Sequence, residues 1–205
     1  MSLQKVIKYL NTKLKDDVAI SEVYGKENFC YLIYSLIRME QPETVVELGS
    51  GLGSTTCMMA QALKENKKGK LWTIDNGKDW DTTKEFVGED NESYENFFQK
   101  LLERLELNKI VKFKNITMTE GSFFNPQKPV DIVFFDGHDS GPEGCIHLLK
   151  YYLPLMTKYS SIFIDRSSTI NHAYLMLEQL IQYLQQGKIP ACLISNRPRK
   201  EIEAM

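Results

Sequence analysis

The sequence predicts an α/β protein with a mostly parallel sheet of six or seven strands and helices on both faces. Short β-branched runs alternate along the chain with longer segments of helical periodicity, a pattern typical of parallel sheets. Four of the expected strands also end in Gly, Asp or both, in the sequences LGSGLG, IDNG, FFDG and FIDR. Because the carboxyl ends of parallel strands meet at one edge of the sheet, we expect a binding crevice there.

The first expected elements are two N-terminal helices, near residues 2–14 and 26–39, the second ending before Pro42 because a residue preceding proline disfavours helical backbone. The strands are expected at Thr44–Leu48, Lys70–Asp75, Ile110–Asn115, Val130–Asp136, Ser161–Asp165 and Ala191–Ser195. The helices between them are expected near Thr55–Glu65, Glu92–Leu107, Pro142–Leu153 and Asn171–Gln186.

The composition favours one globular domain over residues 1–205. The chain is 42% hydrophobic and 25% charged, and it is long enough to bury one sizeable core. Its net charge is -2 and it has no long basic block, so we expect neither a nucleic-acid partner nor binding to an anionic membrane. A small molecule is therefore the favoured substrate.

The four cysteines indicate a reducing environment. They lie far apart and form no CxxC pair, so neither a disulfide framework nor a zinc site is indicated, and each is expected to be a buried thiol. The charged, amphipathic N-terminus lacks the apolar core of a signal peptide, and no apolar run is long enough to span a bilayer. We expect a cytoplasmic protein.

A glycine-rich loop joins the first strand to the next helix. Gly49, Gly51 and Gly53 permit a tight turn and the close approach of a ligand, while the helix that follows offers free N–H groups at Ser54 and Thr55. Dinucleotides and S-adenosylmethionine both bind such loops. A dinucleotide-dependent oxidoreductase is the weaker alternative, because Ser54 stands where that fingerprint requires a third Gly or Ala.

Acidic residues at the strand ends discriminate between the two cofactors. Glu47, Asp75 and Asp136 are expected to make the rim of the crevice anionic, which favours a sulfonium and an ammonium group over a pyrophosphate. Asp75 ends the second strand and is placed to accept hydrogen bonds from ribose hydroxyls. This role is shared with dinucleotide sites and does not discriminate.

From about Glu43 to Ser168 the chain resembles the class I S-adenosylmethionine-dependent methyltransferases, whose E-x-G-x-G-x-G motif is matched at every fixed position. The resemblance implies a Rossmann-like sheet in which the glycine loop holds the methionine part, Asp75 the ribose and the segment 120–123 the adenine. The cofactor-binding residues expected on this basis are Glu47, Gly49, Ser50, Gly51, Gly53, Ser54, Asp75, Gly121, Ser122 and Asp136.

The end of the fourth strand, VDIVFFDGH at Val130–His138, is similar to that of small-molecule methyltransferases related to the catechol O-methyltransferase group. The chain lacks the Asn-Pro-Pro-Tyr-like tetrapeptide that is common in methyltransferases acting on nitrogen. The resemblance therefore implies methylation of an oxygen atom of a small molecule.

Methyl transfer requires the protein to position the acceptor and to remove its proton. The catalytic candidates are His138, Asp136, Asp165 and Arg166. His138 follows Asp136 closely, and histidine is a residue type suited to act as a general base at neutral pH, although His138 could instead order its own loop. Arg166 could clamp a substrate carboxylate or phosphate, or form a salt bridge with Asp136 or Asp165.

In the catechol group a divalent metal is bound by the carboxylate after the fourth strand and by an Asp-Asn pair after the fifth. The corresponding residues here are Asp136 and the pair Asp165-Arg166. Arg in place of Asn removes an oxygen ligand and adds a fixed positive charge. A magnesium enzyme using Asp136 and Asp165 and a metal-free enzyme both stay open, as does a protein that binds S-adenosylmethionine without turnover.

Residues 1–40 are expected to cap the cofactor site, with Tyr24 as a candidate covering residue. Since the chain ends ten residues after the last expected strand, these helices or a second subunit in a homodimer are expected to complete the pocket. The long segment Asn76–Asn91 carries Trp80 and Phe86, which either cover the ligand or pack their loop onto its own helix. Tyr94, Phe97 and Phe98 are interpreted as an ordinary core stripe of that helix.

Overall fold

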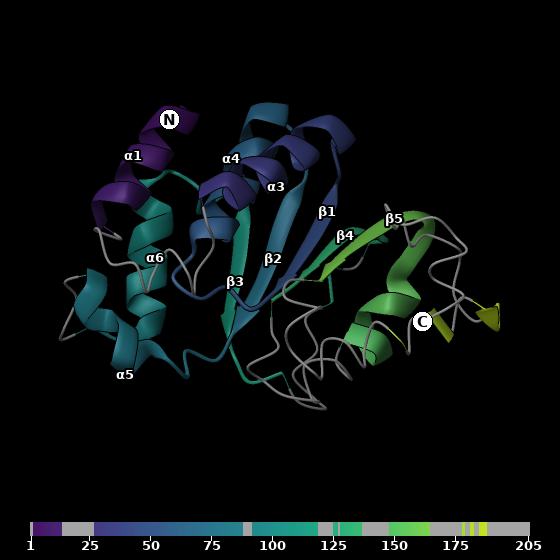
Figure 1. The fold of residues 1–205 in the computed structure, drawn as a ribbon. Coiled ribbons are helices and arrows are strands. Elements are labelled where there is room, and N and C mark those ends of the chain that lie inside the picture. The colour runs from purple at the N-terminus through teal and green to yellow at the C-terminus, as the bar shows by residue number, and fades with distance from the viewer. Residues whose placement is uncertain are drawn as a thin grey trace.

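The structure is a computed structural model, and it describes residues 2–13, 27–87, 92–118, 125–126, 128–136, 148–164, 178, 181–182 and 185–187. Figure 1 shows helices gathered around a central sheet. The α-helices are α1 (Leu3–Lys13), α3 (Glu27–Glu40), α4 (Ser54–Asn66), α5 (Trp80–Thr83) and α6 (Tyr94–Arg104), and the strands are β1 (Thr44–Leu48), β2 (Lys70–Asp75), β3 (Val111–Asn115), β4 (Val130–Phe135) and β5 (Met156–Ile164).

These bounds confirm most of the expected elements. β1 and β2 begin and end at the predicted residues, and the bounds of α1, α3, α4, β3 and β4 differ from the predicted ones by at most one residue at each end. The expected helix Pro142–Leu153 is described only from residue 148, as a π-helical turn at Leu148–Tyr152 followed by a 3-10 turn at Leu153–Leu155. The expected strand Ala191–Ser195 and most of the expected helix Asn171–Gln186 lie outside the described residues.

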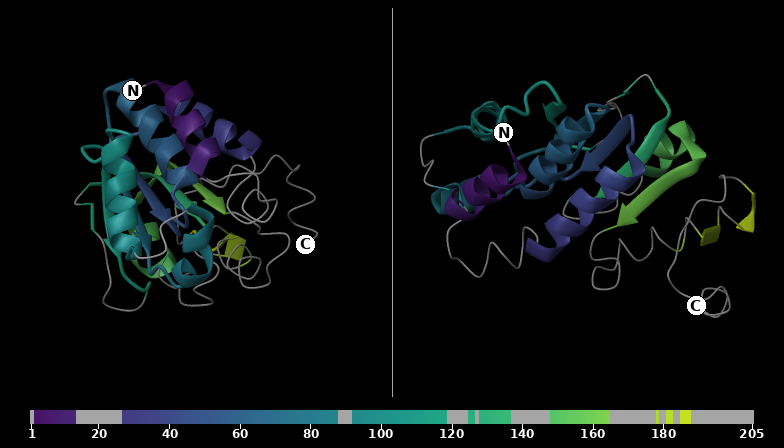
Figure 2. Two further views of the ribbon diagram at one scale, coloured as in Figure 1. Left: turned by 90° about the vertical axis from the view of Figure 1, so that its left-hand side faces the viewer. Right: turned by 90° about the horizontal axis from the view of Figure 1, so that it is seen from above.

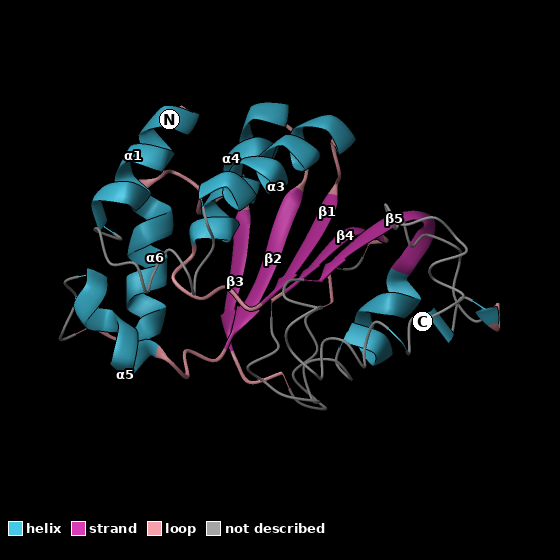
Figure 3. Cartoon of the chain, viewed as in Figure 1, coloured by secondary structure: helices cyan, strands magenta, loops and turns pink. Residues whose placement is uncertain are grey.

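The described strands form one five-stranded sheet in the order β3-β2-β1-β4-β5. Every neighbouring pair is parallel, so all the strands end at the same edge. Figure 3 shows the strands side by side, with helices packed around them. In this topology the strand order runs outward from β1 in both directions, first to β2 and β3 and then to β4 and β5. It confirms the predicted Rossmann-like α/β fold.

The side chains of β1 point alternately to the two faces of the sheet and belong to two separate hydrophobic clusters, one on each face. Val45 belongs to the larger cluster, which also contains buried side chains of α1, α3, α4 and α6. Val46 and Leu48 belong to the smaller cluster, which includes Leu148 and Tyr152. Figure 2 shows α1, α3 and α4 together on one side of the sheet. Helical segments therefore cover both faces of the sheet, as predicted. Cys30 and Cys57 lie in the larger cluster as free, buried thiols.

The helix α3 packs along α4, and its second half lies near the end of α4 that is remote from the glycine loop. Tyr34 donates a hydrogen bond to Glu65, and the Asn66 side chain donates one to the Ile37 carbonyl oxygen at 2.8 Å. Residues 14–26, which join the two N-terminal helices, lie outside the described residues, and the cap over the cofactor site stays a prediction. No helix in the described ranges is long and apolar enough to cross a membrane.

At the opposite edge of the sheet, where the strands begin, β1 and β4 are joined by Asp131. Its Oδ2 accepts hydrogen bonds from the backbone N–H groups of Glu43 at 2.7 Å and Thr44 at 2.9 Å. A surface groove of about 360 Å³ lies beside these residues and is lined in part by Lys128 and Tyr159. Because this groove is at the edge remote from the glycine loop, it is separate from the predicted crevice.

The strand β5 begins at Met156, five residues earlier than predicted. Its pairing with β4 shifts register between Val130 and Ile132. At this irregularity the Ser160 hydroxyl donates to the Val130 carbonyl oxygen at 2.6 Å and accepts from the Thr157 N–H at 2.8 Å. The sequence KYSS therefore forms an irregularity within β5, where the Ser160 side chain supplies a hydrogen bond to the neighbouring strand, instead of lying before the strand as expected.

Gly69 allows two segments to meet at the base of the sheet, which leads to a prediction about stability. Gly69 has φ +89, and a Cβ placed there would lie 2.3 Å from the Pro42 carbonyl oxygen. We expect Gly69→Ala to lower the free energy of unfolding by at least about 2 kcal/mol, through backbone strain together with this clash. Urea denaturation would measure the change.

Gly187→Ala is the matched control, because Gly187 also has positive φ, +65, but an added Cβ would meet no atom of the described residues within 4 Å. Its substitution should cost only the conformational strain, about 1 kcal/mol. Equal losses of stability in the two variants would contradict the importance of the close approach at Gly69.

Candidate functional site

The ends of β2, β1 and β4 lie side by side at one edge of the sheet. The Gly49 N–H donates to the Ile74 carbonyl oxygen, and the Asp136 N–H donates to the Leu48 carbonyl oxygen, both at 2.8 Å. These bonds place the glycine loop between Asp75 and Asp136. The predicted convergence is therefore confirmed for three strand ends, while the fourth, at Asp165 and Arg166, lies outside the described residues.

The glycine loop turns through a series of left-handed backbone conformations. Gly49, Gly51 and Gly53 have φ values of 97, 50 and 86, which residues with a side chain rarely adopt. Gly53 precedes the first turn of α4, and a Cβ there would lie 2.7 Å from Leu101 Cδ2 of α6. The glycines are thus required by the loop itself and by its close packing on α6.

Asp75 binds the backbone of this loop. Its Oδ2 accepts from the Gly51 N–H and its Oδ1 from the Gly77 N–H, each at 2.8 Å. Burial raises the pKa of Asp75 above its ordinary value, although hydrogen bonds from the N–H groups of Gly51, Gly77 and Ser50 act in the opposite direction. A carboxylate offers about four acceptor positions, so capacity is left for a ribose hydroxyl, and this predicted role stays a prediction.

Glu47 does not lie on an open rim, and this part of the sequence interpretation is wrong. Its side chain is fully buried and points toward α4, because residues 45 and 47 of β1 share the face that α4 covers. Glu47 Oε2 accepts hydrogen bonds from the hydroxyls of Thr56 and Thr73, both at 2.5 Å. The carboxyl group therefore lies beneath the glycine loop and not at its surface.

A chain of hydroxyl groups connects the loop to this buried carboxyl. The Ser50 and Thr73 hydroxyl oxygens are 2.5 Å apart, and Thr73 in turn donates to Glu47. Because Thr73 has a single hydroxyl proton, Ser50 is the donor to Thr73. Glu47 Oε1 has no hydrogen-bond partner among the described residues. Burial raises the pKa of Glu47 to about 7, and the charge of Asp75 acts in the same direction.

Tyr94 contacts the glycine loop, and the sequence interpretation missed this contact. Its ring is buried, as expected of a core stripe, but its hydroxyl donates to the Gly51 carbonyl oxygen at 2.7 Å. The residue type itself was a signal in the sequence that could have identified this contact. A tyrosine in a stripe otherwise made of Phe97 and Phe98 carries a hydroxyl that must find a partner when it is buried.

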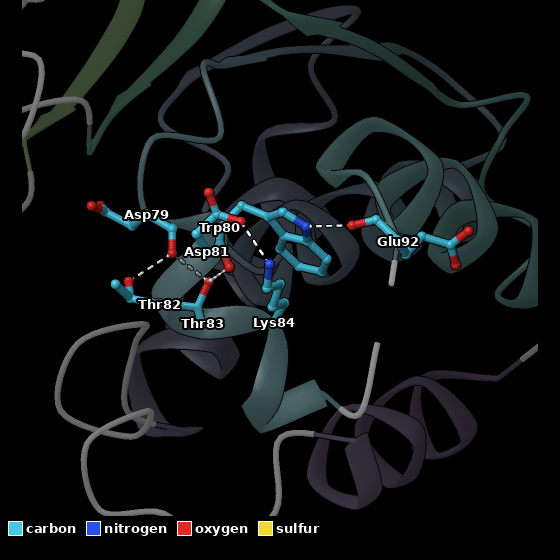
Figure 4. Close-up of polar contacts among 7 residues, drawn as sticks. All are labelled: Asp79, Trp80, Asp81, Thr82, Thr83, Lys84 and Glu92. Carbon is cyan, nitrogen blue, oxygen red and sulfur yellow. Dashed lines mark hydrogen bonds and ion pairs between the residues drawn. The ribbon is translucent and has the colours of Figure 1, made fainter. Parts of the chain in front are cut away.

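Trp80 packs its loop onto α6 and does not cover the crevice. Its ring centroid lies 4.7 Å from that of Phe97, and its side chain is 7% exposed. As Figure 4 shows, the indole Nε1–H donates to the Glu92 carbonyl oxygen, at 2.7 Å, while Thr82 and Thr83 bond back to the Asp79 carbonyl oxygen. Of the two readings of this segment, packing onto its own helix is confirmed for Trp80.

Several predicted site residues lie outside the described residues or have undescribed side chains. They are Tyr24, Phe86, Gly121, Ser122, His138, Asp165 and Arg166, and their roles stay predictions. In the described part of the chain, no three His, Cys, Asp or Glu residues come together as a metal site would require. Asp136 is half-buried at the end of β4 and is the one predicted metal ligand that the structure describes.

Residues 46–167 match the family model for the methyltransferase domain. This match spans more than half of the chain, from the middle of β1 to just beyond β5. The protein therefore belongs to the methyltransferase domain family, which confirms the resemblance found in the glycine loop and disfavours the oxidoreductase alternative. A comparison with curated proteins finds no match.

Solved structures of O-methyltransferases share the fold. CalS11, a TDP-rhamnose 3'-O-methyltransferase of calicheamicin biosynthesis, is 14% identical with a TM-score of 0.60, over 97% of this chain and 84% of that chain. A putative caffeoyl-CoA O-methyltransferase from Staphylococcus aureus is 14% identical with a TM-score of 0.54, over 87% of this chain and 88% of that chain. TomG from Streptomyces achromogenes, an O-methyltransferase in complex with S-adenosylmethionine, is 15% identical with a TM-score of 0.50, over 89% of this chain and 84% of that chain.

The buried carboxyl of Glu47 leads to a prediction about pH and stability. Because its pKa is raised from 4.5 to about 7, the folded protein holds a proton that the unfolded chain releases. The contribution of Glu47 to stability is fully present below pH 4.5 and is lost as the pH rises to about 7, a change of roughly 3 kcal/mol. Glu47→Gln cannot titrate, so its free energy of unfolding should depend less on pH over this range.

Urea denaturation between pH 5 and 8 would test this expectation. Thr56→Val is the complementary variant, because it removes a hydrogen bond that lowers the pKa of Glu47. It should extend the loss of stability to higher pH. Identical pH profiles for the wild type and Glu47→Gln would contradict the assignment.

Proposed function

We propose that this protein transfers a methyl group from S-adenosylmethionine to an oxygen atom of a small molecule. The observation that carries the proposal is the meeting of a three-glycine loop with the carboxyl groups of Asp75 and Asp136 at one edge of the sheet. Membership of the methyltransferase domain family supports it. The O-methyltransferase neighbours with the same fold favour oxygen as the acceptor atom.

The charges at this edge suit S-adenosylmethionine. Asp75 and Asp136 flank the loop, whereas Glu47 lies beneath it with a pKa that burial raises to about 7, so that it carries only part of a negative charge near neutral pH. A sulfonium and an ammonium group are attracted by these carboxyls, whereas a pyrophosphate is repelled. The acceptor positions left on Asp75 fit a ribose hydroxyl, and the three glycines let the methionine part approach the backbone.

When bound, the sulfonium group supplies a methyl carbon that is already activated for displacement. The residues of the chain then have to hold the acceptor in line and take up its proton. His138, close after Asp136 in the sequence, is proposed as the general base, and Arg166 as a clamp for an anionic acceptor. Asp136 and Asp165 are the residues that would hold a magnesium ion.

Binding of the cofactor can be tested at Asp75. We expect Asp75→Asn to weaken the affinity for S-adenosylmethionine by about 10- to 100-fold, because a charged acceptor is lost from the loop and the ribose. Isothermal titration calorimetry would measure this, with NAD titrated in parallel.

The matched control is Asp79→Asn, which removes a neighbouring negative charge from an exposed side chain without touching the glycine loop. Its affinity should stay within about twofold of the wild type, as expected for a screened surface charge. Binding of NAD and not of S-adenosylmethionine by the wild type would overturn the proposed function.

Turnover can be tested at His138. A panel of phenols, sugar hydroxyls and carboxylates, assayed for transfer of a labelled methyl group, would identify the acceptor. We expect His138→Ala to lower kcat by about 10²- to 10⁴-fold, while the affinity for S-adenosylmethionine is unchanged, because the variant removes only a proton acceptor. Binding of the cofactor without transfer to any acceptor would favour the alternative of a non-catalytic binding protein.

The role of magnesium is decided in the same assay by adding EDTA. Loss of transfer with EDTA and its recovery with Mg²⁺ would establish a metal enzyme. The cytoplasmic location, the lack of nucleic-acid partners and the homodimer stay predictions, and light scattering of the purified protein would measure its oligomeric state.

A further inference from the structure

Both backbone polar groups of Gly51 form hydrogen bonds with side chains from outside the loop. Its N–H donates to Asp75 Oδ2 at 2.8 Å, and its carbonyl oxygen accepts from the Tyr94 hydroxyl at 2.7 Å. Asp75 is the last residue of β2 and Tyr94 the first of α6, so the two contacts come from different elements. They act on the central glycine of the loop, which has a φ of 50.

The ring of Tyr94 cannot easily move away from this position. It makes edge-on contacts with Phe98 and Phe113, at centroid distances of 5.8 and 5.6 Å. On another side it lies against Gly77, where an added Cβ would come within 2.6 Å of Tyr94 Cδ1. Ser93, the residue before it, caps α6 by accepting a hydrogen bond from the Asn96 N–H at 3.3 Å. The direction of the hydroxyl is therefore set by the packing of α6 on the sheet.

A loop with three glycines loses much conformational entropy when it is ordered. If the loop is already held in the conformation that binds a ligand, this cost is not subtracted from the affinity. Asp75 has two roles here, since it binds the Gly51 N–H and is also predicted to accept a hydrogen bond from a ribose hydroxyl. Tyr94 touches the loop through the Gly51 carbonyl oxygen, and its ring is too buried to meet a ligand itself.

We infer that Tyr94 is a positioning residue for the cofactor: its hydroxyl holds Gly51 in the conformation that binds the adenosyl cofactor. This inference rests on the proposed function. Tyr94 acts through the glycine loop and takes no part in methyl transfer, so its loss should change the affinity for the cofactor and leave kcat at saturating cofactor nearly unchanged.

The test compares two Tyr→Phe variants of the full chain. Tyr94→Phe removes the hydroxyl on Gly51 and keeps the ring, while Tyr34→Phe removes a hydroxyl that bonds Glu65 between α3 and α4, away from the loop. Calorimetry with S-adenosylhomocysteine should show an affinity about five- to tenfold weaker in Tyr94→Phe and unchanged in Tyr34→Phe. Equal affinities in the wild type and Tyr94→Phe, or equal losses in both variants, would overturn the inference.

Hydrogen exchange of the protein without ligand gives a second readout, which does not depend on the cofactor. The amides of residues 49–54 should exchange faster in Tyr94→Phe than in the wild type or in Tyr34→Phe. Unchanged exchange in Tyr94→Phe would overturn the positioning role. If the wild type binds no S-adenosylhomocysteine, the proposed function fails, and the exchange rates still decide whether Tyr94 orders the loop.

Discussion

The pairing of β1 between β2 and β4 is the constraint on which the candidate site depends. All five residues of β1 are buried, and both of its edges are hydrogen-bonded to parallel neighbours. The register aligns Leu48 with Ile74 on one side and with Phe135 on the other. The residues that follow these three partners are Gly49, Asp75 and Asp136, so the sheet itself brings the site together.

The glycine loop contacts or covers two carboxyl groups in different environments. Asp75 accepts hydrogen bonds from backbone N–H groups, which are fixed by the loop, and these bonds favour its charged form. Glu47 accepts from two threonine hydroxyls and keeps one oxygen without a partner among the described residues. The loop thus lies between a carboxylate that orders it and a buried carboxyl that titrates near neutral pH.

Much of the fold could be predicted because its signals are local. The β-branched run of β1 is bounded by Pro42 and Gly49, and the alternation of strand and helix patterns identifies a parallel sheet. The start of β5 could not be predicted, because Ser160 replaces ladder hydrogen bonds by side-chain bonds that depend on Val130 of another strand. The burial of Glu47 was missed for a similar reason: a motif shows that an acid is near the loop, but not which face of the strand it occupies. The role of Tyr94 depends on a contact across 43 positions of the chain.

The two tryptophans of the chain lie in β2 and in the helix α5 that follows it, and they report on different parts of the interior. Trp72 packs against the hydrophobic cluster on one face of the sheet, whereas Trp80 belongs to the cluster on the other face. Both are close in sequence to Asp75. Intrinsic fluorescence therefore offers two native optical probes around the candidate site, and single Trp→Phe replacements would separate the signal of the one face from that of the other.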